Sequence, residues 1–141
     1  MVIYAESSAL LAWLLGEPKA AVVANVLNGA TTSVTSELTL IECDRAFHQG
    51  VAANRLTTAF AKKASSDLVA TTASWAVMRF LPSIITRARQ SFPNEPIRAL
   101  DALHVASALQ ARQEHPQIAL LSLDDRIRKV GASLGFEILP K

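Results

Sequence analysis

The sequence predicts a three-layer α/β/α sandwich built on a mostly parallel β-sheet. Short, almost entirely apolar runs such as 2–5 and 118–123 are typical of strands buried on both faces of a parallel sheet. Segments with helical periodicity and recognisable end signals alternate with these runs. The 141 residues are half apolar and show no repeat or linker, so we expect one domain, 1–141, with its own core.

The first half of the chain predicts two strands and three helices. In order, they are a strand over 2–5, a helix over 9–15, a helix over 19–27, a strand over 31–34 and a helix over 36–48. Ser7 and Ser8 offer an N-cap for the first helix, and the β-branched run 31–34 favours a strand. Gly50 is expected to close the third helix, because glycine is common just beyond helix ends.

The second half predicts four helices and two strands. The helices are expected over 55–68, 82–90, 101–113 and 125–134, and the strands over 118–123 and 136–139. Two prolines make 92–96 a clear break before the third of these helices. Residues 69–74 fit a short edge strand or a loop equally well, because their periodicity decides for neither.

Cysteine content and hydropathy indicate a cytoplasmic protein. Cys43 is the only cysteine, so it has no intramolecular disulfide partner, and no zinc-binding pattern surrounds it. The longest uninterrupted apolar stretch, 9–15, is far too short to span a bilayer, and the first residues show no basic leader. We therefore expect no membrane association.

The net charge of +2 is unevenly distributed along the chain. Residues 1–70 carry 5 basic and 6 acidic side chains, whereas residues 71–141 carry 9 basic and 6 acidic ones. This imbalance is too small to indicate nucleic-acid binding, because arginine and lysine commonly solvate helix faces.

Four acidic residues stand near the expected carboxyl ends of the strands, where ligands bind in open parallel sheets. Glu6 and Asp124 each directly follow a strand, Glu42 lies about two turns into a helix, and Asp101 opens another helix. Carboxylates about 5 Å apart repel by roughly 3 kcal/mol, so four of them in one cleft would either raise their pKa values or bind a cation. Oxygen ligands favour Mg²⁺ or Mn²⁺, ions that support phosphodiester hydrolysis. Helix capping remains the alternative role for the two aspartates.

Four segments of the chain resemble the PIN-domain family. This chain has counterparts of four sequence motifs of the family. They are an opening strand followed by Asp-(Thr/Ser)-Ser-Ala-Leu, a glutamate in a helix, the signature Leu-Asp-Ala-Leu-His-Leu-Ala-x-Ala and the block Thr-x-Asp-x-Arg. The counterparts are VIYAESSALL at 2–11, SELTLIE at 36–42, LDALHVASA at 100–108 and LSLDDR at 121–126. Only the middle, about 51–80, is generic.

The resemblance implies a sheet of order 3-2-1-4-5 and a metal-dependent endoribonuclease, the toxin half of a VapBC-like toxin–antitoxin pair. It implies that Glu6, Glu42, Asp101 and Asp124 are catalytic, metal-binding acids for Mg²⁺ or Mn²⁺. Ser8 is expected to place a hydroxyl beside the first carboxylate, whereas Arg98 and Arg126 fit phosphate contact and solvation equally well. The implied partners are an RNA substrate, a cognate antitoxin and a second copy of the chain in a homodimer. Single-stranded or loop RNA is favoured, since a shallow cleft reaches a splayed backbone more easily than a duplex.

Position 6 departs from the family, which has aspartate where this chain has Glu6. The departure keeps open a second hypothesis, a PIN fold that has lost catalysis and binds RNA or protein. A phospho-acceptor receiver or phosphatase is not supported, because no second acid accompanies Glu6. We expect His104 to fill the core between apolar neighbours. An apolar groove for an antitoxin is expected at Trp13, Leu14, Phe47 and Phe60.

Overall fold

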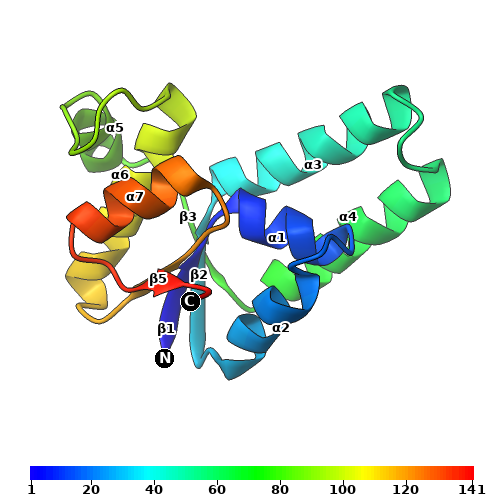
Figure 1. Ribbon diagram of the computed structural model, residues 1–141, viewed down its shortest axis with the longest axis horizontal. Helices are drawn as coiled ribbons and strands as arrows, with labels where there is room; N and C mark the ends of the chain where they lie inside the picture. Colours follow the sequence, from blue (N-terminus) through cyan, green and yellow to red (C-terminus); the bar gives the residue numbers. More distant parts are fainter.

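A five-stranded, wholly parallel sheet forms the centre of the computed structural model, which describes all 141 residues (Figure 1). The strands are β1 (Val2–Ala5), β2 (Thr32–Ser36), β3 (Ala76–Met78), β4 (Ala119–Leu121) and β5 (Ile138–Leu139). They lie in the order β3-β2-β1-β4-β5, and every neighbouring pair is parallel. The predicted sandwich and its strand order are confirmed.

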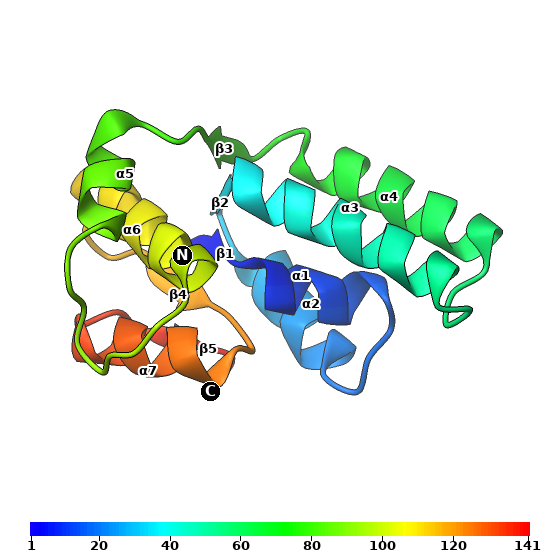
Figure 2. The ribbon, with the colours of Figure 1, turned by 90° about the horizontal axis from the view of Figure 1, so that it is seen from above.

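Seven helices cover the two faces of the sheet. They are α1 (Ser7–Leu14), α2 (Ala20–Gly29), α3 (Glu37–Ala52), α4 (Thr58–Thr72), α5 (Pro82–Ala88), α6 (Ala99–Glu114) and α7 (Asp125–Ser133). Figure 2 shows α1 to α4 on one side and α5 to α7 on the other. None of the seven has the length and apolar character needed to cross a membrane.

The central strand β1 contributes to both halves of the core. Ile3 and Ala5 pack into an apolar cluster with side chains of α1 to α4. Tyr4, between them, packs into a second cluster with side chains of α5, α6 and α7. Successive side chains of a strand point to opposite faces of the sheet, and helices cover both faces. All three residues are therefore fully buried. This explains why the run carries no polar residue before Glu6.

The structure corrects the predicted end of α3. Gly50 lies inside this helix, which continues to Ala52 instead of ending near His48. A Cβ atom at Gly50 would come within 2.6 Å of the Leu56 Cδ1 atom, so the missing side chain gives space to the turn that follows. The glycine serves close packing, which overrides its low helix propensity.

The third strand lies beyond the segment that the sequence left ambiguous. Residues 69–72 continue α4, and β3 begins only at Ala76. The buried Leu68 and Thr72 keep the end of α4 against the core. Strand β3 is a short edge strand of three apolar residues, of which Ala76 and Val77 are exposed. Its sequence has no alternation of apolar and polar residues that could have predicted a strand.

Gly131 gives a test of how closely α7 packs on the sheet. A Cβ atom there would lie 2.5 Å from Leu120 Cδ2 and 3.1 Å from Ile138 Cδ1. We expect Gly131→Ala to lower the free energy of unfolding in urea by about 1–3 kcal/mol, the usual effect of overpacking. Gly29→Ala is the control, since nothing lies within 4 Å of its Cβ position. Equal stability of the two variants would contradict this packing.

Candidate functional site

Glu6 is a buried carboxylate at the carboxyl edge of the sheet. It directly follows β1, is 3% exposed and is the N-cap of α1, where its Oε1 accepts the Ser8 N–H at 3.0 Å. Three hydroxyls also donate to this carboxylate: Ser7 to Oε1 at 2.7 Å, Ser122 to Oε2 at 2.7 Å, and Ser8 to Oε2. Four donors thus compensate the burial of the charge and fix the orientation of the group.

Glu42 and His104 meet Glu6 from the two sides of the sheet. The Glu42 Oε1 atom on α3 lies 3.1 Å from the Ser7 hydroxyl, whose one proton is shared between Glu6 and Glu42, and 2.5 Å from His104 Nε2. The same nitrogen lies 4.0 Å from Glu6 Oε1. One ligand atom from each of the three residues lies within 4.8 Å of the others, an arrangement that could hold a metal ion.

Tyr4 supports His104 from within the core. The Tyr4 hydroxyl lies 3.2 Å from Nδ1 of this imidazole, which is only 1% exposed. Burial raises the pKa of Tyr4, and the charges of Glu6 and Glu42 raise it further, so the phenol keeps its proton. A carboxylate only accepts, so His104 Nε2 carries the proton that bonds to Glu42, and the Tyr4 hydroxyl lies against Nδ1.

Asp101 and Asp124 open the helices on the other side of the sheet. The Asp101 Oδ2 atom accepts the Arg98 N–H at 3.3 Å at the start of α6. Asp124 caps α7, where its Oδ1 accepts the backbone N–H groups of Arg126 at 2.8 Å and Ile127 at 3.1 Å. Asp124 thus has the capping role that the sequence left as an alternative, whereas α6 begins at Ala99, before the expected start, so Asp101 lies at its third position and bonds back to the N-cap residue Arg98.

The two aspartates are close enough to affect one another. Burial raises the pKa of Asp101 and the nearby charge of Asp124 adds to the rise, while the Arg98 backbone hydrogen bond and the charges of Arg126 and Arg98 oppose it. A cation between two such carboxylates would relieve the repulsion. Neither aspartate belongs to the tight group formed by Glu6, Glu42 and His104.

Ser8 and Ser122 connect the two pairs of acids. The Ser8 hydroxyl accepts the backbone N–H groups of Leu123 at 2.8 Å and Asp124 at 3.1 Å. The Ser122 hydroxyl also accepts the Asp124 N–H, at 3.1 Å. Both hydroxyls donate to Glu6, so the position of Asp124 depends on the Glu6 carboxylate.

The arginines near the acids differ in their roles. Arg98 and Arg126 are exposed, and both lie close enough to Asp101 to affect its pKa. Arg128, two residues after Arg126, instead donates to the backbone carbonyls of Ser122 at 2.7 Å, Leu139 at 3.0 Å and Pro140 at 2.9 Å. Its guanidinium fastens the C-terminal strand and is not free for a ligand.

Sequence reasoning missed the side chains that hold the glutamates. His104 is buried, as expected, but it also contacts Glu42. In the sequence, His104 follows Asp101 by three residues, so the two side chains share one face of the helix. This spacing was the available signal that His104 lies near the site. The sequence offers Ser7 as an N-cap of α1, a position that Glu6 occupies instead, and Ser122 gives no signal beyond its closeness in sequence to Asp124. Burial and the adjacent Glu42 raise the pKa of the Cys43 thiol to about 12, so this cysteine is no nucleophile.

Comparisons with known proteins show which ribonucleases and toxins the chain resembles. A ribonuclease named VapC35 from two strains of Mycobacterium tuberculosis is 28% identical to the chain over 141 residues, covering 98% of this chain and 96% of the relative. The crystal structure of M. tuberculosis VapC20, described as a sarcin–ricin loop cleaving toxin, superposes with a TM-score of 0.64 at 15% identity, covering 95% of both chains.

A second solved structure has the same fold. VapBC2 from Rickettsia felis, bound to a DNA fragment from its promoter, superposes with a TM-score of 0.66 at 11% identity, covering 98% of this chain and 97% of the other. The sequence profile of the PIN domain matches residues 3–133, which is nearly the whole chain. With the sheet order and the four acid-bearing segments in place, this match shows that the chain belongs to the PIN-domain family.

Proposed function

We propose that this chain is a divalent-metal-dependent endoribonuclease and the toxin half of a VapBC-like toxin–antitoxin pair. The observation that carries the proposal is the set of acids at the carboxyl edge of the sheet, with Glu6 and Glu42 held together and Asp101 and Asp124 opening the adjacent helices. The ribonuclease VapC35 matches along almost the full length of both chains, which supports the same activity here.

The donor set fits a hard cation such as Mg²⁺ or Mn²⁺. Glu42, Asp101 and Asp124 are partly exposed and offer carboxylate oxygens as ligands. Both oxygens of Glu6 already accept hydrogen bonds from the protein, so we place its contact with the ion through water. The bound ion would lower the pKa of a water molecule and neutralise charge on the scissile phosphate.

The chain's own groups orient the acids and the RNA. His104 and Ser7 hold Glu42, whereas Ser8 and Ser122 hold the start of α7. The exposed Arg98 and Arg126 lie close to Asp101, so of the two roles that the sequence leaves open for them we propose phosphate contact. A partly open site of this kind suits single-stranded or loop RNA.

Metal dependence tests the proposed activity directly. We expect the purified chain to cleave a mixed pool of single-stranded RNA with Mn²⁺ or Mg²⁺ and to lose that activity in EDTA. Mn²⁺ should support faster cleavage, because Mg²⁺ demands near-ideal octahedral geometry and the longer Glu6 side chain departs from the family pattern. Cleavage that persists in EDTA would exclude the metal mechanism.

The rival function is an RNA- or protein-binding module without catalysis. It is favoured by one observation, the complete hydrogen bonding of Glu6 within the protein. Binding of RNA by both wild type and Glu6→Asp, with no cleavage by either protein in Mn²⁺, would support this function over the nuclease.

The proposal includes an antitoxin, a homodimer and a cytoplasmic location. Phe47 is part of the core, which corrects its expected place in the antitoxin groove. Trp13 and Leu14 line a hollow of about 300 Å³, and Phe60 is 41% exposed, so these three remain candidates. Growth arrest on expression, relieved by an antitoxin encoded beside the toxin, would support the pairing, and light scattering would give the oligomeric state.

A further inference from the structure

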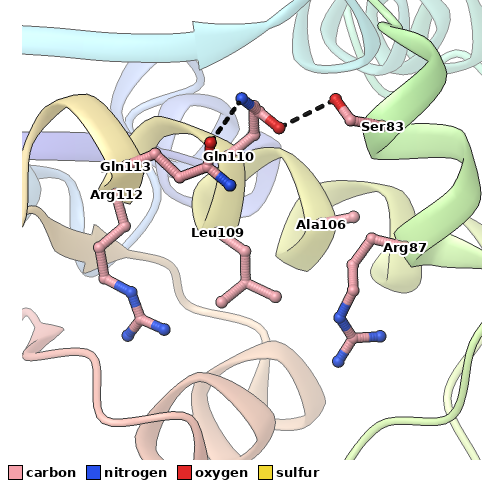
Figure 3. Close-up of a pocket in the computed structure, with 7 residues that line it drawn as sticks. All are labelled: Ser83, Arg87, Ala106, Leu109, Gln110, Arg112 and Gln113. Atoms are coloured by element: carbon pink, nitrogen blue, oxygen red, sulfur yellow. Dashed lines mark hydrogen bonds between the residues drawn. The ribbon is translucent and has the colours of Figure 1, made fainter.

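A hollow of about 420 Å³ lies between α5 and α6, away from the acids (Figure 3). Arg87 and Arg112 lie on either side of Leu109, with both guanidinium groups pointing the same way. We call this hollow the arginine groove. Arg112 lies 11 residues after Asp101 on α6, so it is about 16 Å from that acid along the helix axis.

Both guanidinium groups are held in place by the protein. The Arg87 guanidinium carbon lies 3.9 Å from the centre of the Phe92 ring, and its Nη1 donates to the Ser91 carbonyl at 3.2 Å. Arg112 lies 4.3 Å from the centre of the Phe136 ring, and its Nη1 donates to the Leu134 carbonyl at 2.8 Å. Stacking and one backbone bond reduce the entropy lost on binding, while Nε and Nη2 of each arginine remain available.

Neither arginine has an anionic partner in the protein. The ion pairs of the chain involve only Lys63, Lys141 and His104, and no acidic residue lines the groove. The opposite flank is neutral, with Ser83 donating to Gln110 and Gln110 to Gln113. Two half-buried cations beside neutral hydrogen-bonding groups attract an anion, and guanidinium forks match phosphate oxygens.

The placement of the two arginines favours a chain of phosphates over a single small anion. They are separated by Leu109 and do not converge on one point, so one phosphate group cannot occupy both forks in the same way. We propose that the arginine groove binds two backbone phosphates of the RNA, outside the segment at the acids. This inference rests on the proposed nuclease function and adds a second contact region for its substrate.

The salt dependence of RNA binding tests the groove. In EDTA, so that no cleavage occurs, the affinity for a single-stranded RNA of about 20 nucleotides should fall in Arg87→Gln/Arg112→Gln. The slope of log K against log salt should become shallower by about 1.4, because each lost phosphate contact contributes about 0.7 for single strands. Arg89→Gln/Lys62→Gln is the matched control, with the same change in charge at two exposed residues outside the groove.

Cleavage kinetics give a second readout. The double glutamine variant should raise KM for the long RNA while kcat stays unchanged, and it should cleave a three-nucleotide substrate as wild type does. Arg87→Lys/Arg112→Lys keeps both positive charges and should keep most of the salt slope. This variant separates the effect of the charges on RNA binding from the effect of stacking on the phenylalanine rings. If the glutamine variant proves unfolded by circular dichroism, Gln110→Glu is used instead and should weaken RNA binding by adding a carboxylate to the groove.

If Arg87→Gln/Arg112→Gln is folded and its slope of log K against log salt equals that of wild type, the proposal is overturned. The proposal is also overturned if inorganic phosphate binds in the groove while the affinity for RNA does not depend on the two arginines. If wild type cleaves RNA and the slope is unchanged, only the groove is rejected. If wild type neither binds nor cleaves RNA, the proposed function fails with it.

Discussion

Glu6→Gln is expected to slow metal-dependent RNA cleavage by about a hundredfold, the typical result of displacing catalytic groups by about 1 Å. The three serine hydroxyls and the Ser8 N–H that surround Glu6 all donate to a carboxylate. An amide offers one acceptor atom and one NH₂ donor, so some of these hydroxyls must turn away. Because Ser8 and Ser122 also bind the backbone at Asp124, their rearrangement moves a second acid.

Glu6→Asp and Asp101→Asn complete this series. Aspartate is the residue of the family pattern and retains the charge, so Glu6→Asp should keep or raise the activity. Asp101→Asn removes a proposed ligand and should abolish cleavage, a loss of roughly 4 kcal/mol or about a thousandfold. All four proteins are assayed on the same mixed RNA pool, with RNA binding measured in parallel. Equal rates for wild type and Glu6→Gln would show that the Glu6 charge has no part in the reaction.

His104→Leu is expected to weaken Mn²⁺ binding to the chain by about 10- to 100-fold, as for other residues that orient a metal ligand. The hydrogen bonds from Tyr4 to His104 and from His104 to Glu42 fix the Glu42 carboxylate, whose side chain is 26% exposed. Leucine fills the buried space without a donor, which leaves Glu42 free to change rotamer. Mn²⁺ affinity is measured by electron paramagnetic resonance, independently of cleavage.

Two controls separate orientation of Glu42 from core packing. His104→Gln places an amide donor near the position of Nε2 and should recover most of the Mn²⁺ affinity. Tyr4→Phe removes only the hydrogen bond to Nδ1, so it should have a smaller effect than His104→Leu. If His104→Leu lowers the melting temperature but leaves Mn²⁺ affinity unchanged, the histidine is a core residue alone.

The sequence determined the fold class because its strongest signals are local. Buried strands such as 2–5 need apolar residues at every position, and helix caps such as Ser36 lie next to the helix they start. Where the signal was tertiary, the prediction was wrong or undecided. Gly50 marks close packing inside α3 instead of its end, and β3 is defined by pairing with β2 instead of by its own pattern.

By itself, the sequence singled out four acids as candidates, two directly after strands, one at the start of a helix and one about two turns into a helix. Only the tertiary structure decided how these acids are held, because their partners lie far along the chain. Ser122 is 116 residues from the Glu6 that it contacts, and His104 is 62 residues from Glu42. Hydrogen bonds depend on distances of about 3 Å, and no sequence spacing fixes such distances across a parallel sheet whose crossovers vary in length.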